Sequence, residues 1–185
     1  MSDHHRTVRA ALVGYGMFGS DVVAGSLWDL ARNGIAPYLD RVGLDDWCGA
    51  YHDIGFELTA IGARSEASAR RAERETAEVT GVAPRVFWGD RPWESIAATF
   101  PDLDVLVVAT PDHLHTAPIL HALERGIHVL TEKPLCLDLQ EADAIIHLAD
   151  NKNLIVGVDM HKRYDPDHLR IFEELRPALG TPLYA

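Results

Sequence analysis

Hydrophobic positions near the start of the chain change from a continuous run to helical spacing across a glycine turn. Residues 10–13 are all apolar and lead directly into the turn at residues 14–19. Apolar side chains then return at three- and four-residue intervals between Val22 and Leu30, which is the spacing of one helix face. Strand, glycine turn and helix in this order form the dinucleotide-binding fingerprint. The pattern therefore predicts a nucleotide site at this first connection.

Each residue of the turn has an expected part in that site. Gly14 makes the tight turn off the strand, Gly16 lets a pyrophosphate sit against the backbone, and Gly19 lets the helix pack close to the sheet. Met17 and Phe18 complete the loop, and the helix N-terminus that follows offers unpaired N–H groups to the phosphates. We predict that these residues contact the cofactor. Taken alone, the glycine spacing would also fit an ordinary loop.

Further along the chain, strand and helix patterns continue to alternate. Strand patterns occupy residues 56–61, 85–88, 104–109, 127–130 and 154–158, and helical patterns occupy residues 66–79, 93–100, 116–125 and 138–149. This order predicts an α/β fold over residues 1–165, a doubly wound parallel Rossmann sheet with helices on both faces. Ligands of such a sheet bind at the carboxyl ends of its strands.

Residues 33–55 interrupt the alternation. Asn33 and Gly34 indicate a helix stop, and the stretch that follows contains glycines, a proline and three aromatic residues. We interpret it as a surface insertion with its own small apolar cluster. The alternative is an oligomer contact or a wall of the substrate site, and the sequence does not decide between these interpretations.

The end of the second strand indicates which cofactor binds. In such folds an acidic residue at this point accepts hydrogen bonds from the ribose of NAD, whereas an arginine accommodates the 2′-phosphate of NADP. No acidic residue is present here, and Ala63 is followed by Arg64 and Ser65. We expect Arg64 to bind the phosphate through its forked guanidinium, and Ser65 to cap the next helix and offer its hydroxyl to the same group. NADP is therefore the predicted cofactor, with NAD possible.

Three more arginines follow on that helix. Arg70, Arg71 and Arg74 lie among several glutamates at helical spacing. We expect all three to form a solvated face paired with Glu66, Glu73 and Glu78, rather than to contact the cofactor.

Composition narrows the function classes. The chain has 185 residues, and its acidic residues outnumber its basic ones by 28 to 17. This balance argues against nucleic acid, which is bound by clustered Lys and Arg. No stretch approaches the roughly 20 apolar residues of a membrane span, and the N-terminus lacks a signal-peptide pattern. Cys48 and Cys136 are far apart and fit reduced thiols, so we expect a cytoplasmic protein.

Three motifs together resemble one family. Residues 14–19, the stretch Ala109-Thr110-Pro111-Asp112-His113-Leu114-His115 and Glu132-Lys133-Pro134 have the order and spacing of the glucose–fructose oxidoreductase / inositol dehydrogenase (Gfo/Idh/MocA) family. The Glu-Lys-Pro motif after the fifth strand, coupled to the motif after the fourth, is the most specific part. The resemblance extends over about residues 8–164.

The resemblance implies a pyridine-nucleotide oxidoreductase whose small-molecule substrate is a sugar, polyol or related hydroxyl or carbonyl compound. Lys133 matches the family's catalytic lysine, Thr110 and Pro111 match the turn beside the cofactor, and Glu132 matches a residue near the nicotinamide end. A second α/β domain carries the substrate pocket, and residues 166–185 would be its connecting helix and first strand. That domain also supplies a catalytic Asp and His, for which no residue here is assigned. We expect the full-length form to be a homo-oligomer.

The residues support a role for Lys133 independently of the family. A lysine at the carboxyl end of a buried strand can have its pKa lowered by desolvation towards the working pH, and it would hydrogen-bond the substrate oxygen that gains or loses a proton. The alternative is a solvated side chain. A non-catalytic nucleotide-binding or redox-sensing module with the same fold is the rival function.

The histidines leave two further alternatives. His113 and His115 form an HxH pair beside Asp112, which would suit zinc, but no fourth ligand with suitable spacing appears, so we predict no metal. We expect His115 to pack near the cofactor loop instead. The strand exit that begins at His161 could reach substrate or a cofactor phosphate, or could be solvated.

Overall fold

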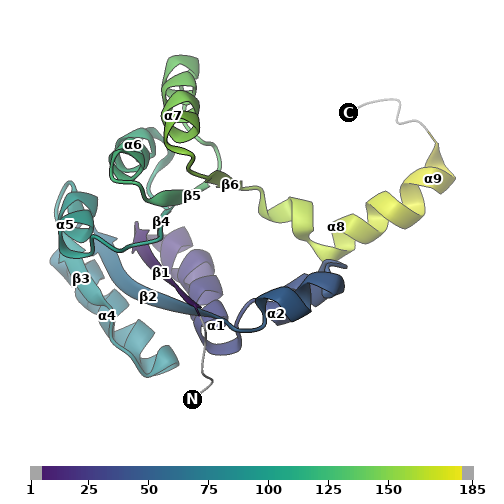
Figure 1. Ribbon diagram of the computed structural model, residues 1–185, viewed down its shortest axis with the longest axis horizontal. Helices are drawn as coiled ribbons and strands as arrows, with labels where there is room; N and C mark the ends of the chain where they lie inside the picture. Colours follow the sequence, from purple (N-terminus) through teal and green to yellow (C-terminus); the bar gives the residue numbers. More distant parts are fainter. Residues whose placement is uncertain (1–5, 181–185) are drawn as a thin grey trace.

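A six-stranded parallel sheet forms the centre of the molecule (Figure 1), and the computed structural model describes residues 6–180. Its order is β3-β2-β1-β4-β5-β6. The strands are β1 (Arg6–Val13), β2 (Ile54–Ala63), β3 (Arg85–Trp88), β4 (Val105–Val108), β5 (His128–Glu132) and β6 (Val156–Asp159). The chain builds outwards from β1 to β3, then crosses back to β4 and builds the other half. This is the predicted doubly wound Rossmann sheet.

Helices cover both faces of the sheet, as predicted. One face carries α1 (Gly25–Asn33), which continues η1 (Gly19–Ala24), and α4 (Glu66–Thr80). The other face carries α5 (Pro92–Thr99), α6 (Thr116–Glu124) and α7 (Leu139–Lys152). Alternation along β1 explains this double core: Ala11 and Val13 pack with the second group of helices, while Leu12 between them packs with the first.

Local signals fix the helix ends. Ser65 caps α4 by accepting a hydrogen bond from the Ser68 backbone, and Asp138 caps α7 in the same way. Gly34 ends α1 and Gly81, in the left-handed conformation, ends α4.

The insertion is shorter than predicted, because β2 begins at Ile54 rather than at residue 56. The additional residues extend the parallel pairing, with Ile54 opposite Arg6. Between the helix stop and β2 lie α2 (Ala36–Arg41), η2 (Asp45–Trp47) and α3 (Cys48–Tyr51), none of which contains a buried residue. Trp47 and Tyr51 stack with ring centroids 5.9 Å apart. The segment therefore lies at the surface, and its part in an oligomer contact or in the substrate site stays a prediction.

Beyond β6 the chain leaves the sheet as an arm of short helical segments, η4 (His161–Tyr164), α8 (Pro166–Arg170), η5 (Ile171–Leu175) and α9 (Arg176–Leu179), which extends away from the body (Figure 1). Apolar side chains of the arm are exposed, including Ile171, Phe172 and Leu179. The strand expected at residues 181–185 lies outside the described residues. Across residues 6–180, no helix is long and apolar enough to cross a membrane.

Candidate functional site

The carboxyl ends of β1, β4, β5 and β6 meet at one edge of the sheet. Val13 lies opposite Val108, which in turn lies opposite Thr131, and Glu132 lies opposite Asp159. The glycine turn, the Thr110 turn and the Glu-Lys-Pro motif follow these strand ends directly. The register therefore gathers the three predicted motifs on one edge.

The three turn glycines lie in different surroundings. Gly14 has a φ of 104°, and a Cβ there would lie 2.3 Å from the carbonyl oxygen of Ala109. A Cβ on Gly19 would lie 2.1 Å from the carbonyl oxygen of Gly14, so only glycine allows the helix to approach the turn this closely. Gly16 is different, because nothing lies within 4 Å of an added Cβ. Its open surroundings leave room for a ligand against the backbone.

The helix after the turn starts differently from the prediction. Residues Gly19–Ala24 form a π-helix before the α-helix begins at Gly25, and no side chain caps its start at Phe18. Two glycines, which are weak helix formers, bound this stretch. Met17 is largely exposed, and the Phe18 ring lies 6.4 Å from the ring of His161 across the edge. Met17 and Phe18 thus point outwards at the site, whereas Tyr15 of the same turn is buried.

The end of β2 lies beside the glycine turn, because the Gly14 amide donates to the Gly62 carbonyl at 2.9 Å. Arg64 is exposed two residues further on, and it forms no ion pair within the part of the chain that the structure describes. The Ser65 oxygen accepts from the Ser68 amide at 3.3 Å, so the expected helix cap is present. Arg64 is therefore available to a ligand at the turn.

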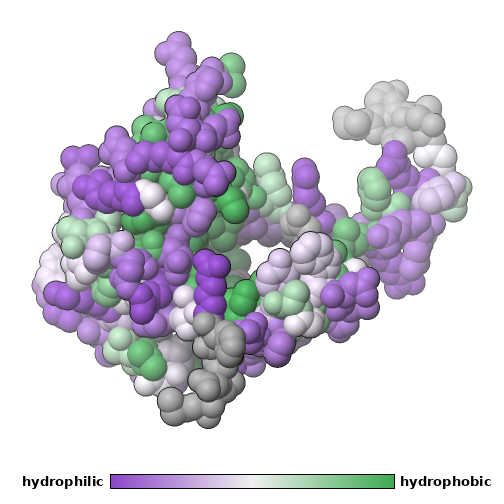
Figure 2. Space-filling view, in the orientation of Figure 1, coloured by the Kyte–Doolittle hydropathy of each residue, from purple (hydrophilic) through white to green (hydrophobic). Residues whose placement is uncertain are grey.

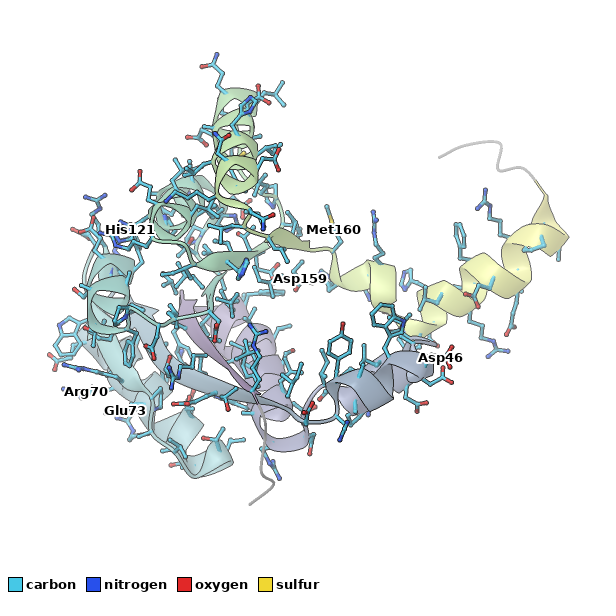
Figure 3. All side chains as sticks on the ribbon, viewed as in Figure 1. Asp46, Arg70, Glu73, His121, Asp159 and Met160 are labelled. Carbon is cyan, nitrogen blue, oxygen red and sulfur yellow. The ribbon has the colours of Figure 1, made fainter. Side chains whose placement is uncertain are left out.

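The three helix arginines are exposed, as expected, but only Arg70 pairs with the predicted glutamates. Between residues 6 and 180 Arg74 forms no ion pair, so the predicted pairing is wrong for it. Arg70 pairs with Glu66 and Glu73 at the surface. Arg70 and Glu73 are labelled in Figure 3. Arg71 instead lies over the ring of Tyr15, with Glu75 as a distant partner at 4.0 Å. Sequence spacing could not show this contact, because it joins α4 to a turn that lies far away in the chain.

His115 bridges the loop after β4 and the loop after β5. The ring is fully buried, with Nδ1 2.7 Å from the Pro134 carbonyl oxygen and Nε2 2.8 Å from the Thr110 carbonyl oxygen. A neutral imidazole has one N–H and can donate to only one of these oxygens at a time. Since both nitrogens face carbonyl groups, His115 has none left for a zinc ion shared with His113.

Two buried polar atoms at this edge lack a partner among residues 6–180, Thr110 Oγ1 and Glu132 Oε1. Burial raises the pKa of the Glu132 carboxyl well above its ordinary range, and the neighbouring Asp159 raises it further. Lys133 follows as an exposed residue, so this chain alone does not provide the burial assumed for it. The Lys133–Pro134 peptide bond is cis. The edge therefore offers unsatisfied oxygens beside an exposed ammonium group.

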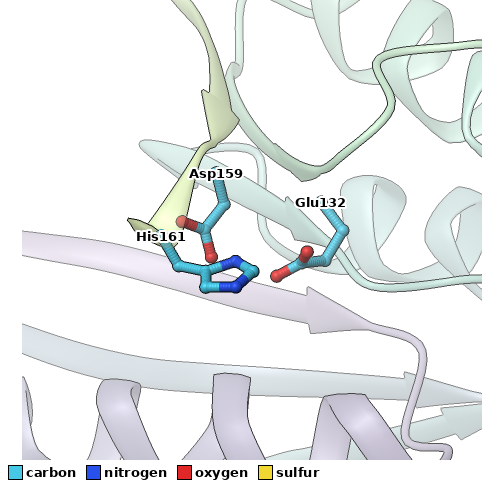
Figure 4. A group of neighbouring side chains, drawn as sticks. All are labelled: Glu132, Asp159 and His161. Carbon is cyan, nitrogen blue, oxygen red and sulfur yellow. The ribbon is translucent and has the colours of Figure 1, made fainter. Parts of the chain in front are cut away.

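The sequence analysis missed Asp159. Its carboxylate, the Glu132 carboxylate and the His161 ring point towards one another (Figure 4), with their ligand atoms all within 4.8 Å. Figure 3 shows Asp159 and Met160 where β6 ends and the arm begins. The signal that could have revealed Asp159 was the strand register, because β6 ends directly beside the Glu132 motif on β5.

Comparisons with known proteins agree with this geometry. The model of an oxidoreductase family with an NAD-binding Rossmann fold matches residues 8–160. Inositol 2-dehydrogenase 4 from Saccharopolyspora erythraea is 31% identical over 97% of this chain, which covers 44% of that enzyme.

Solved structures share the fold. A dehydrogenase from Clostridium difficile matches 90% of this chain with a TM-score of 0.67 and 17% identity, and the match covers 44% of that structure. Biliverdin reductase from Synechocystis, in complex with biliverdin and NADP+, matches 91% of this chain with a TM-score of 0.58 and 23% identity, and the match covers 42% of it. The chain thus spans less than half the length of these relatives. Because the family model covers residues 8–160, which is most of the chain, the protein belongs to the Gfo/Idh/MocA family of oxidoreductases with an NAD-binding Rossmann fold.

Proposed function

We propose that the protein is an NADP-preferring oxidoreductase that transfers hydride to or from a sugar, a polyol or a related hydroxyl or carbonyl compound. The observation that carries the proposal is the meeting of the glycine turn, Thr110 and Lys133 on one sheet edge, after the adjacent strands β1, β4 and β5. The similarity to an inositol dehydrogenase supports the substrate class.

The residues present fit a dinucleotide. The open space at Gly16 suits a pyrophosphate, and the exposed Arg64 beside the turn suits a 2′-phosphate. The orphaned hydroxyl of Thr110 and the orphaned oxygen of Glu132 would gain partners from a ligand at the edge. When bound, the nicotinamide cofactor supplies or accepts the hydride.

The protein's own residues would orient the reactants and handle the proton. Thr110 and Pro111 would border the cofactor, and Glu132 would lie at its nicotinamide end. His115 is buried, so its part would be to position the Thr110 and Pro134 backbone. Lys133 is the proposed catalytic residue, and its ammonium would hydrogen-bond the substrate oxygen as charge develops there.

We propose that the arm at residues 166–180 connects to a substrate domain. Its exposed apolar side chains support this, since apolar side chains gathered on one exposed surface are typical of a surface that contacts another domain. Turnover would then require the residues of that domain together with Lys133.

Fluorescence titration tests the cofactor assignment. NADPH is expected to bind more tightly than NADH, and Arg64→Ala should remove most of the difference, because a charge-assisted contact to phosphate is worth about 1.5–3 kcal/mol, roughly tenfold to a hundredfold. Arg74→Ala, an exposed arginine on the helix that follows Arg64, is the control and should keep the preference. Equal affinities for the two cofactors would refute the NADP preference. Tight binding without turnover in the full-length form would favour the rival sensing module.

A further inference from the structure

The end of β6 brings an unexpected group of side chains to the edge. Glu132 and Asp159 are register partners at the ends of β5 and β6, and His161 follows after one residue. One carboxylate oxygen from each acid and one ring nitrogen of the histidine lie within 4.8 Å of one another (Figure 4). Two carboxylates and an imidazole therefore converge on one point from two adjacent strands.

Burial makes this arrangement costly as it stands. Glu132 is 8% exposed, and its Oε1 has no hydrogen-bond partner within the described part of the chain. Neither Glu132 nor Asp159 takes part in an ion pair between residues 6 and 180. A buried carboxylate oxygen is normally paired or bound to a metal, and two carboxylates that face each other repel. The exposed Lys133 ammonium next in the chain offsets this only in part.

We propose that Glu132, Asp159 and His161 form a binding site for a divalent first-row transition-metal cation such as Mn²⁺. Carboxylate oxygen together with imidazole nitrogen is a ligand set that such ions accept. Ligand atoms on one ion lie about 2.0–2.2 Å from it, and so about 3–4.4 Å from one another. Small side-chain rotations would bring the three ligand atoms to these separations. The site departs from the absence of metal that the sequence analysis predicted.

Three protein ligands leave coordination positions open, and the surroundings give them access. Asp159 lines a hollow of about 850 Å³ bordered mainly by α1, and Figure 2 shows the molecule hollowed between the sheet body and the arm. His161 also reaches towards Phe18 of the glycine turn. A water molecule or a substrate oxygen could take these positions. Coordination of a substrate oxygen rests on the proposed oxidoreductase function, whereas binding of the ion itself does not.

Titration of the chelator-treated 185-residue chain with MnCl₂, followed by the electron paramagnetic resonance of free Mn²⁺, tests the site. One saturable ion per chain is expected. Asp159→Asn and His161→Ala should each weaken binding at least about tenfold. Mutation of a residue that only hydrogen-bonds a metal ligand typically costs about 10–100-fold in affinity, so loss of a ligand itself should cost at least the lower figure. Both residues are at least partly exposed, so the variants should fold, which circular dichroism would verify. His168→Ala is the matched control, since it removes another exposed histidine that lies beside a carboxylate, Asp165.

The titration contains no NADPH and no substrate, so its failure would leave the proposed function standing. The absence of saturable binding up to about 1 mM Mn²⁺, near the weak limit for specific divalent-ion sites, would overturn the metal site and would assign the paired carboxyls a shared proton instead. Binding that survives both Asp159→Asn and His161→Ala would equally overturn it. Weakening by His168→Ala alone would place the ion elsewhere and would also refute the proposal.

Discussion

Arg71 of α4 contacts both the ring and the backbone carbonyl of Tyr15 in the glycine turn. Its guanidinium carbon lies 5.2 Å from the centre of the Tyr15 ring, and its Nη2 donates to the Tyr15 carbonyl at 3.4 Å. The Tyr15 hydroxyl in turn donates to Glu75 Oε2 at 2.5 Å. A helix that follows β2 therefore holds the turn that follows β1, and the shape of the turn depends on side chains from outside it.

The first prediction separates Arg71 from Arg64. Arg71→Ala removes a cation–π contact worth about 0.5–1 kcal/mol at an exposed site and an exposed ion pair worth little. The melting temperature should fall by about 1–4 °C, while the preference for NADPH over NADH is retained. Thermal melts and cofactor titrations check both parts. Arg74→Ala is the control for stability, and loss of the cofactor preference in Arg71→Ala would contradict the division of roles.

The second prediction concerns alkaline pH. Burial of the Tyr15 hydroxyl, strengthened by its hydrogen bond to Glu75, raises its pKa above the ordinary value of about 10. A raised pKa in the folded state means that the stabilisation is complete below about pH 10 and is lost as the pH rises further. Tyr15→Phe cannot ionise at this position. Its free energy of unfolding should therefore decline less steeply than that of the unsubstituted protein above pH 10, as denaturant titrations at several pH values would show. Identical slopes would contradict the prediction.

Much of the fold is predictable because its signals are local. The apolar run before Gly14, the cap at Ser65 and the glycine at residue 34 each act on their immediate neighbours, and each marks an element boundary that the structure contains. The start of β2 has no such local signal. Ile54 belongs to the strand because it pairs with Arg6 of β1, and the residues around Ile54 do not indicate that partner.

The parts of the site in which a motif directly follows a strand could be predicted from the sequence. The contacts between side chains of neighbouring strands could not. Gly16, Thr110 and Lys133 could be assigned to one edge because parallel strands share their carboxyl ends. The contact of Asp159 with Glu132 depends on which strand lies beside β5 and in which register. The contact of Arg71 with Tyr15 likewise depends on how α4 packs. Such relationships arise from packing over a distance, which spacing along the chain does not encode.

The third prediction contrasts two glycines of the turn. In Gly19→Ala the new methyl would overlap the Gly14 carbonyl at 2.1 Å, so the fold should lose about 1–3 kcal/mol or more. In Gly16→Ala the methyl meets nothing within 4 Å, so stability should change by at most about 0.5 kcal/mol. The same methyl would occupy the space expected for the pyrophosphate, so NADPH affinity should fall at least about tenfold, or 1.4 kcal/mol.

A matched control for the glycine pair is Gly49→Ala in α3. Its Cβ also meets nothing within 4 Å, but it lies outside the turn, so NADPH affinity should not change. Thermal melts and fluorescence titrations distinguish the three variants. Unchanged NADPH binding in Gly16→Ala would place the pyrophosphate elsewhere.

The last prediction concerns Lys133 in a full-length form that turns over substrate. The pyrophosphate is expected at residues 14–19, whereas Lys133 lies beyond β5 on the same edge, so its ammonium should contribute little to holding the nucleotide. Lys133→Met keeps much of the stem and removes the charge. The variant therefore loses an interaction that strengthens as charge develops on the substrate oxygen, and the loss should fall on the chemical step. General acid–base assistance is typically worth about 10²–10⁴ in rate, so kcat should fall by that factor while NADPH affinity stays within about twofold.

Steady-state kinetics and cofactor titration on the same preparation check both parts, with Lys152→Met as the control because Lys152 lies at the end of α7. Near-normal turnover in Lys133→Met, or a loss of NADPH binding that parallels the loss of activity, would remove Lys133 from the catalytic role.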